Sequence, residues 1–566
     1  MFTAGHLWAA DLPLDNNGWS IFRTSSDSRV IYCSSSAGND SNNGLSSGSP
    51  VKTLNKAFSL VRNGYPDHVY LKRGDVWTNQ DFQRLKGKSG RSSSQRIVVA
   101  YYGSGNRPRI KLNNTSILSV TSGTLKNLAI IGIEFYNYRA NPSDQSYSYP
   151  GENGVKNGFH FQSGRVLDFL LEDCKLSYFR YLINIFNNGH GGGDAFINID
   201  IRRNILVNAY NIGTTSAKIK SQGIYASHTK DLLIEENFMD RNGWYQGRGD
   251  TQPNQYNHNI YLSSDNAGPC VVRGNVLSQG AAHGLQLRSG GTAEKNAFIG
   301  NAVGMNIGYS NKPVYYSGAT VVRDNVFTDG RPQIPNDFTS PQTGAIWGLW
   351  KQKIDNVTVR HNIVANIQDT RGGNMKPYNE GFQGNPDAFG PGNIAWNWRE
   401  GNFPTPAPNW KDASRDKDKF AKARGYNSYQ TWVNAACRRG IKSWPTEFTA
   451  YDYVNYIRTG FNKSSVSPPS YNRNGRQAPQ QKLPHSAEAT PASFRTYPNP
   501  ASEQLTIEGT GDYRLEVYDL TGRQVLRHER LQDETTLDIR HWQPGVYMVK
   551  ISDRAGAQFR QRVIIR

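Results

Sequence analysis

Sulfur and long apolar runs are both scarce in this sequence of 566 residues. It contains 4 cysteines and 5 methionines, and 37% of its residues are hydrophobic. No apolar run approaches the ~18 residues of a membrane-spanning helix, so we expect no membrane span. The cysteines lie far apart without a C-x-x-C pair, which argues against a zinc site and against a dense disulfide framework; they are Cys33, Cys174, Cys270 and Cys437.

Acidic residues are few relative to basic ones. The chain has 65 Lys and Arg against 46 Asp and Glu, a formal net charge of +19. An excess of this size favours a polyanionic partner such as nucleic acid, an anionic polysaccharide or a charged surface, and a charge that serves solubility alone is the alternative. The basic residues are dispersed along the chain, which disfavours nucleic acid.

The composition and a repeated phrase point to a β solenoid. The chain has 55 Gly, 30 Tyr and 12 Trp, which favours a turn-rich β protein. A phrase of alternating apolar residues followed by Asn and a further apolar pair recurs at intervals of 21 to 38 residues, typical of solenoid coils. A buried Asn at the same turn of each coil can bond to its equivalents above and below. The predicted ladder consists of Asn204, Asn237, Asn275, Asn296, Asn325 and Asn362, with Cys174 in the equivalent place one coil earlier.

The phrase at residues 31–64 combines a strand, a turn rich in Gly, Asn and Asp, and a short amphipathic helix. With the repeats, it resembles the opening coil of the right-handed parallel β-helix found in polysaccharide lyases and related hydrolases. The resemblance covers residues 24–400 and implies an all-β fold. Residues 401–463 are charged and helix-compatible, and we expect them to form a cap over the open end of the solenoid. Residues 464–492 have the Pro, Ser and Gln composition of a linker.

Both ends of the chain bear on its location. Residues 1–23, an N-terminal extension, lack the basic and apolar regions of a secretory signal, so the chain is trimmed, has a misassigned start, or stays inside the cell. Residues 493–566 alternate apolar and polar positions between turns and predict a small C-terminal β-sandwich. They resemble the type IX secretion sorting domain of Bacteroidetes at residues 497–500, 520–523 and 544–547. The resemblance implies the type IX machinery as a partner, a secreted or cell-surface protein, and a Sec signal missing from this chain.

The second strand of successive coils predicts a binding surface. Its inward positions are all apolar, and its outward positions stack into three columns. The first column contains Gln222, His258 and His283; the second contains His160, Tyr225, Tyr261, Gln286 and Asn306; the third contains Gln162, Ser227, Ser263 and Arg288.

This inventory matches the needs of β-elimination on a uronate. The reaction needs a cation on the sugar carboxylate, a base for the α proton and an acid for the leaving oxygen. Arg288 suits the first role because its planar fork binds carboxylates. The candidates for the base are His258, His283 and Tyr261, and those for the acid are Tyr225 and Tyr261. Expected substrate contacts are His160, Gln222, Gln286 and Asn306, with Trp244, Tyr245 and Arg248 from the loop 241–257.

Two other functions stay open at this point. A glycoside hydrolase that acts on an acidic or sulfated glycan needs two carboxyl groups ~5 to 9.5 Å apart, and no acidic residue falls in the three columns. A non-catalytic glycan-binding surface protein needs neither acid nor base. The acidic residues available to a hydrolase are Asp194, Glu235, Glu236, Asp240, Asp250 and Asp265.

The resemblance to alginate and chondroitin lyases is incomplete. Those enzymes use a Lys and Arg pair, often with calcium, and only Arg288 has a counterpart here. Lys220 and Lys295 lie outside the columns, and no calcium ligands are identified. From the residues in the three columns and the resemblance of the C-terminus to a sorting domain, we predict a secreted, monomeric polysaccharide lyase that degrades an acidic polysaccharide.

Overall fold

The computed structural model describes most of the chain in two compact units, residues 1–478 and 479–566. Its description covers residues 12–187, 195–213, 219–308, 314–331, 346–365, 375–378, 392–398, 409–469, 495–497, 501–508, 512–519, 523–532, 535–553 and 558–566.

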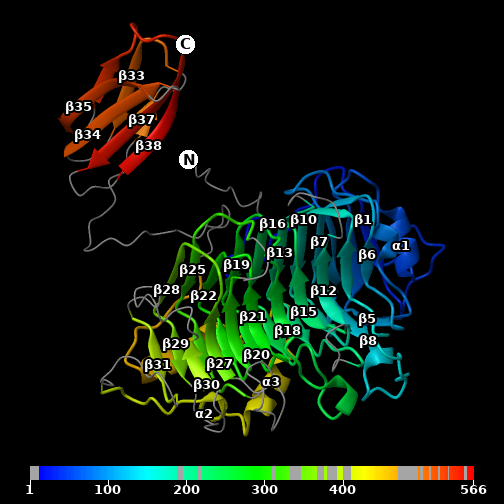
Figure 1. Ribbon diagram of the computed structural model, residues 1–566. Helices are drawn as coiled ribbons and strands as arrows, with labels where there is room; N and C mark the ends of the chain where they lie inside the picture. Colours follow the sequence, from blue (N-terminus) through cyan, green and yellow to red (C-terminus); the bar gives the residue numbers. More distant parts are fainter. Residues whose placement is uncertain are drawn as a thin grey trace. The chain divides into compact units, whose positions relative to one another are not determined.

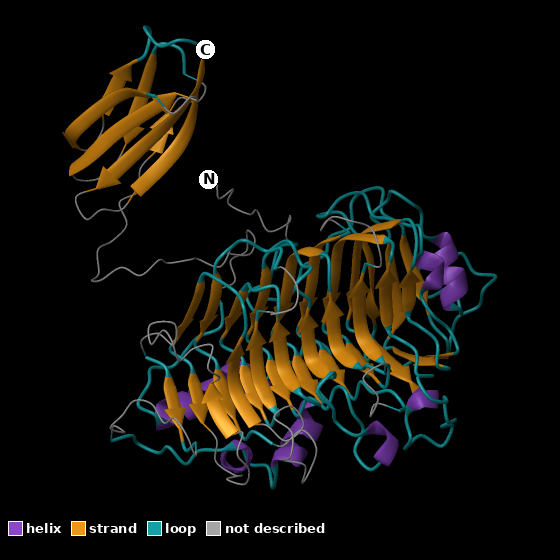
Figure 2. Ribbon diagram, in the orientation of Figure 1, coloured by secondary structure: helices purple, strands orange, loops and turns teal. Residues whose placement is uncertain are grey.

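The first unit is a parallel β-helix built from three long sheets (Figures 1 and 2). From β4 to β30 each coil contributes one strand to each sheet, and every pair within these sheets is parallel. The first sheet contains β1 (Val30–Cys33), β2 (His68–Lys72), β4 (Ile97–Tyr102), β7 (Thr124–Ile131), β10 (Arg165–Glu172), β13 (Phe196–Arg202), β16 (Thr229–Glu235), β19 (Cys270–Arg273), β22 (Thr292–Glu294), β25 (Thr320–Arg323) and β28 (Val357–Arg360).

The other two sheets complete each coil. The second contains β3 (Val76–Thr78), β5 (Arg109–Leu112), β8 (Glu134–Asn137), β11 (Lys175–Ser177), β14 (Ile205–Val207), β17 (Phe238–Asp240), β20 (Val276–Ser278), β23 (Ala297–Ile299), β26 (Val326–Thr328), β29 (Ile363–Ala365) and β31 (Ile394–Trp396). The third contains β6 (Leu118–Val120), β9 (Phe159–Gln162), β12 (Tyr181–Phe186), β15 (Gln222–Ala226), β18 (His258–Leu262), β21 (His283–Leu287), β24 (Val303–Ile307), β27 (Ile346–Lys351) and β30 (Met375–Tyr378). Short 3₁₀ turns span Gln83–Leu85, Tyr138–Ala140, Gly249–Thr251 and Thr446–Phe448.

The predicted asparagine ladder runs through the interior of the solenoid. Each amide donates to the next, from Asn204 to Asn237 at 3.0 Å and onward to Asn362. Asn393 adds a further rung. The backbone N–H of Cys174 donates to Asn204, so the cysteine occupies the predicted equivalent place. All four cysteines are unpaired.

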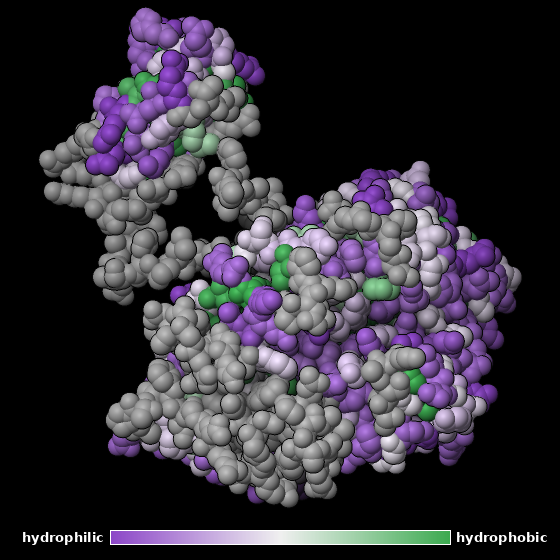
Figure 3. Space-filling view, viewed as in Figure 1, coloured by the Kyte–Doolittle hydropathy of each residue, from purple (hydrophilic) through white to green (hydrophobic). Residues whose placement is uncertain are grey.

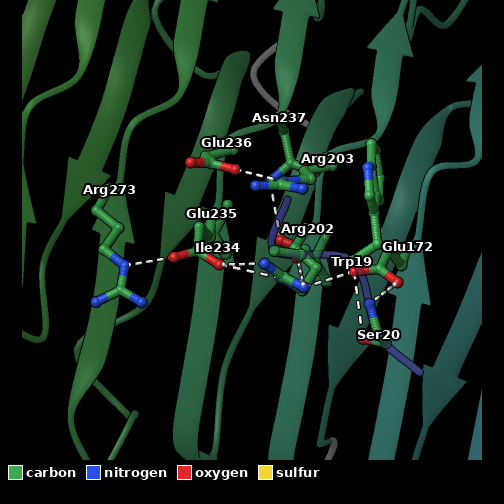
Figure 4. A network of polar contacts seen from close by, with 12 residues as sticks. Trp19, Ser20, Glu172, Arg202, Arg203, Ile234, Glu235, Glu236, Asn237 and Arg273 are labelled. Atoms are coloured by element: carbon green, nitrogen blue, oxygen red, sulfur yellow. Dashed lines mark hydrogen bonds and ion pairs between the residues drawn. The ribbon is translucent and has the colours of Figure 1, made fainter. Parts of the chain in front are cut away.

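Charged residues form a second ladder at the C-terminal ends of strands β10, β13, β16 and β19 of the first sheet (Figure 4). The strand register aligns Glu172, Arg202, Glu235 and Arg273, which are buried. Arg202 pairs with Glu172 at 2.5 Å and with Glu235 at 3.0 Å, and Arg273 pairs with Glu235 at 2.6 Å. Ser20 from the N-terminal segment donates its backbone N–H to Glu172, so residues near the N-terminus cover one end of this ladder.

Four helices accompany the solenoid in the described part of the chain. α1 (Leu54–Leu60) closes the first coil, since Leu54, Ala57 and Phe58 enter the core. α2 (Lys417–Ala423), α3 (Tyr429–Ala436) and α4 (Ala450–Gly460) pack on apolar outward positions of the second sheet. The segment expected to cap the open end therefore lies along a side of the solenoid, because β17, β20, β23, β26 and β29 present apolar residues there.

The second unit has two antiparallel sheets around one apolar core. One contains β32 (Arg495–Tyr497), β33 (Gln504–Glu508) and β36 (Thr535–Asp538); the other contains β34 (Asp512–Asp519), β35 (Gln524–Gln532), β37 (Gly545–Asp553) and β38 (Gln558–Ile565). The fold is thus the predicted all-β solenoid followed by a small β-sandwich. Residues 498–500 and 520–522 of the sorting-domain phrases lie outside the described residues.

No helix in the described ranges is long and apolar enough to cross a membrane.

Candidate functional site

The strand register of the third sheet places the predicted columns side by side. Gln222 pairs with His258 and His258 with His283, while Tyr225, Tyr261, Gln286 and Asn306 follow one another on β15, β18, β21 and β24. One strand of this sheet, β12, was not predicted from the sequence. β12 lies between β9 and β15, so His160 pairs with Asn184 rather than with Tyr225.

The side chains of β18 do not alternate strictly between the inner and the outer face. Asn259 points inward, where its amide donates to the Ser278 carbonyl at 3.1 Å, and Ile260 enters the core. Two consecutive inward positions leave His258 and Tyr261 together on the outer face, with ring centroids 5.4 Å apart. Although they face outward from the solenoid, His258 and His283 are buried. In the view that faces this sheet, the described surface around it is largely hydrophilic (Figure 3).

His258 and His283 form a hydrogen-bonded pair. Their Nδ1 atoms are 3.1 Å apart, and the His283 backbone N–H also donates to His258 Nδ1 at 3.4 Å. Since His258 Nδ1 accepts from the backbone, it carries no proton, and the proton between the rings belongs to His283 Nδ1. In the neutral ring this pattern leaves His283 Nε2 with its lone pair. That atom is buried and has no hydrogen-bond partner in the described part of the chain.

Both histidines are held neutral at physiological pH. Burial lowers the pKa of His283 to about 3, with a smaller contribution from the positive charge of Arg288. Burial also lowers the pKa of His258 well below its usual value, assisted by His283, Arg288 and Lys220. A neutral imidazole with an unprotonated nitrogen can accept a proton.

Arg288 and two tyrosines lie beside this pair. Arg288 follows β21 and donates through Nη1 to the Tyr261 hydroxyl, with its guanidinium 4.8 Å from the Tyr261 ring centroid. The rings of Tyr225 and Tyr261 meet edge to face, with centroids 5.0 Å apart. Burial raises the pKa of Tyr225, and Tyr261 adds to the shift, so the Tyr225 phenol stays protonated at neutral pH.

The remaining candidates of the columns divide into two kinds. Gln222 accepts from the His258 backbone N–H at 2.7 Å and donates to the Tyr256 carbonyl at 2.7 Å. Both the oxygen and the nitrogen of its amide are therefore bonded to the backbone. The ring of His160 contacts the amides of Asn157 and Asn184. In contrast, Gln286 Oε1 and Asn306 Oδ1 are buried and have no partner among the described residues.

The loop residues predicted to contact substrate make contacts elsewhere. Trp244 donates to the Gln279 carbonyl at 2.8 Å, and the Tyr245 ring packs against Tyr210 with centroids 5.4 Å apart. Arg248 pairs with Asp250 at 2.6 Å. Within the described residues, no contact joins these three side chains to the histidine pair.

The acidic residues available to a hydrolase are mostly engaged elsewhere. Glu235 belongs to the charged ladder and Glu236 pairs with Arg203 at 2.5 Å. Asp240 is buried and hydrogen-bonded to Ser278 at 2.7 Å, and Asp194 lies outside the described residues. Asp265 accepts from Ser263, a residue of the third column, at 3.0 Å.

Calcium, which the resemblance associates with such lyases, finds no preformed ligand set. No group of three or more His, Cys, Asp or Glu that could hold a metal ion occurs in the described ranges. The three columns supply imidazole, phenol, amide and guanidinium groups, whereas calcium prefers carboxylate and carbonyl oxygens.

Comparison with known proteins identifies the C-terminal unit. Residues 495–566 match the family described as a secretion system C-terminal sorting domain. No curated protein sequence matches the chain. Among solved structures, the lacto-N-biosidase of family GH136 from Eubacterium ramulus, as native protein, is 13% identical with a TM-score of 0.37, over 62% of this chain and 67% of that one. Its selenomethionine derivative is 12% identical with a TM-score of 0.31 over the same shares. Through its sorting domain, this β-helix protein is exported by type IX secretion and is secreted or displayed at the cell surface.

Proposed function

We propose that this protein is a secreted enzyme that cleaves a uronate-containing polysaccharide by β-elimination. One observation carries the proposal: the buried, unpartnered Nε2 of neutral His283 on β21 lies on the same face as Arg288, which directly follows β21 and whose positive charge acts on His283. A base and a carboxylate-binding cation at one rung are the two groups that abstraction of a proton next to a carboxylate requires.

Each group has a role in the proposed reaction. Arg288 binds the uronate carboxylate and stabilises the charge that develops when the α proton leaves. His283 Nε2 takes that proton, the C–H electrons form the new C=C bond, and the C–O bond to the leaving sugar breaks. Tyr261 gives its hydroxyl proton to the leaving oxygen, and its phenolate is stabilised by the Arg288 hydrogen bond. Proton exchange with water restores both residues.

Substrate binding itself strengthens the base. Arg288 contributes to the low pKa of His283 in the free protein. A bound carboxylate offsets this positive charge and so raises the pKa of His283, although burial remains the larger cause of its low value. His258 acts as a positioning residue because its Nδ1 fixes the protonation pattern of His283.

The product assay tests the proposed function directly. The purified protein is incubated with a panel of polyuronates and glycosaminoglycans, and ultraviolet absorbance and reducing ends are followed in parallel. Both signals rise together if elimination occurs, since each cleavage creates one C=C bond and one reducing end. Reducing ends without absorbance would contradict the proposal in favour of hydrolysis, and binding without either signal would indicate a glycan-binding protein.

A further inference from the structure

The outer face of β24 differs in charge from that of the neighbouring strand β21. Val303 and Asn306 on β24 pair with His283 and Gln286 on β21, and Gly308, directly after β24, donates its backbone N–H to the Leu287 carbonyl next to Arg288. We call Val303, Asn306 and Gly308 the β24 rung. It carries no charged side chain. The neighbouring residues His283, Gln286 and Arg288, which we call the β21 rung, include the guanidinium of Arg288.

Two amides mark this part of the face as a binding surface. Gln286 and Asn306 are paired across β21 and β24, they are 4% and 2% exposed, and each has an amide oxygen without a partner in the described chain. Buried amides without partners are uncommon in folded proteins. Hydroxyl or acetamido N–H groups of a ligand would satisfy these oxygens, while a carboxylate has only acceptors to offer.

The spacing relates the two rungs to a sugar chain. Adjacent strands lie ~4.8 Å apart, which is close to the length of one pyranose residue. A polysaccharide that follows the solenoid axis therefore places one residue over β21 and the next over β24. The β24 rung itself offers no cation, so a carboxylate placed over it would be desolvated beside two amide oxygens, which is unfavourable.

We propose that the sugar bound over the β24 rung is uncharged, so that the substrate alternates uronate with a neutral, hydroxylated or N-acetylated sugar. This inference rests on the proposed function and narrows its substrate class. It separates copolymers of the two sugar types from polymers made of uronate alone.

The test compares two pairs of polymers at equal uronate concentration. Hyaluronan and unsulfated chondroitin represent the alternating class, and polygalacturonate and polymannuronate the uniform class. We expect kcat/KM, followed by ultraviolet absorbance, to be about tenfold or more higher for one alternating polymer. Equal or faster elimination from a uniform polyuronate would overturn the inference while leaving the proposed function intact.

Two further measurements keep the inference testable if turnover is low. His283→Ala removes the proposed base but leaves the β24 rung, so its binding of hexasaccharides from both classes reports on recognition alone. Stronger binding of the alternating oligosaccharide supports the inference, and preference for oligogalacturonate or binding of neither overturns it. Asn306→Lys should shift the preference of the enzyme toward polygalacturonate, whereas Asn306→Asp should weaken binding of both classes.

Discussion

The proposed base, His283, is fixed by groups on two adjacent strands. His258 Nδ1 accepts a hydrogen bond from His283 Nδ1. Burial keeps the His283 ring neutral, and Arg288 supplies a nearby positive charge. These features depend on the three-dimensional register of β18 and β21. The sequence predicted that the three residues are neighbours, but it left three candidates for the base, because tautomers follow from hydrogen-bond geometry.

The role of His258 can be separated from that of His283 by a matched pair of variants. His258→Asn keeps an acceptor close to the position of Nδ1, and His258→Leu removes it. We expect His283→Ala to lower kcat by about 10²- to 10⁴-fold, as for the loss of a general base. His258→Leu should lower kcat with little change in KM, and His258→Asn should recover much of the loss. Equal activity of the Leu and Asn variants would contradict the positioning role.

The pH dependence of kcat/KM reports on the free protein. Since the base must be unprotonated and the pKa of His283 is about 3, we expect no acid limb above about pH 4.5. Arg288→Gln removes a positive charge that lowers this pKa, so the residual activity of the variant should show an acid limb at higher pH. An acid limb that appears near pH 6.5 in the parent and does not move in Arg288→Gln would point to another base.

At the scale of elements, the asparagine ladder explains how polar residues are tolerated inside the solenoid. Asn296 accepts from both the backbone and the amide of Asn275 at 2.9 and 3.0 Å. Asn296→Ala leaves a buried backbone N–H without its partner and should lower the free energy of unfolding by about 1–3 kcal/mol. Chemical denaturation measures the change. The exposed Asn55→Ala in α1 is the control and should stay within about 0.5 kcal/mol of the parent; equal effects of both variants would contradict the ladder's contribution.

A buried carboxyl links the helices to the second sheet. Asp329 accepts from the Lys417 backbone at 3.1 Å and from the Tyr453 hydroxyl at 3.2 Å. Burial raises its pKa to about 6, against a usual value of 3.8. The folded protein therefore disfavours the ionised form, and this residue lowers stability progressively as pH rises from about 4 to about 6.

Asp329→Asn removes that pH-dependent penalty and retains an acceptor oxygen. We expect the variant to have a higher Tm than the parent at about pH 8 and a much smaller difference at about pH 4.5. Thermal unfolding at both pH values measures the effect, with the exposed Asp355→Asn as control. A difference that is larger at acid pH would have the wrong sign for a raised pKa.

At the scale of whole elements, the sequence pattern was sufficient to predict the strands and their register where the pattern repeats. The ladder asparagines recur from Asn204 to Asn362 and the outward columns from β15 to β24, so the register of these coils could be predicted from spacing alone. β12 was missed because four consecutive residues of Tyr181–Phe186, from Leu182 to Ile185, are buried, so the strand does not alternate between buried and exposed positions. The helices at residues 417–460 were placed wrongly because the sequence does not reveal which sheet presents an apolar outer face.

For the whole molecule, the sorting domain and the solenoid have distinct functions. Residues 495–566 account for export, and the outer face of the third sheet carries the proposed chemistry. The formal charge of +19 agrees with an anionic substrate, yet within the three columns and the described residues Arg288 is the single cation. Recognition of the substrate charge is thus proposed to be local, a conclusion that net charge alone does not give.

Cleavage in ¹⁸O-labelled water, followed by mass spectrometry of the products, tests the central claim most directly. In β-elimination the leaving oxygen takes a proton from the protein and no water oxygen enters the new ends. We predict unlabelled products, one of which carries a C=C bond and is one water lighter than the hydrolysis product. Incorporation of ¹⁸O at the cleaved bond would show that water is the nucleophile and would contradict the roles assigned to His283 and Arg288.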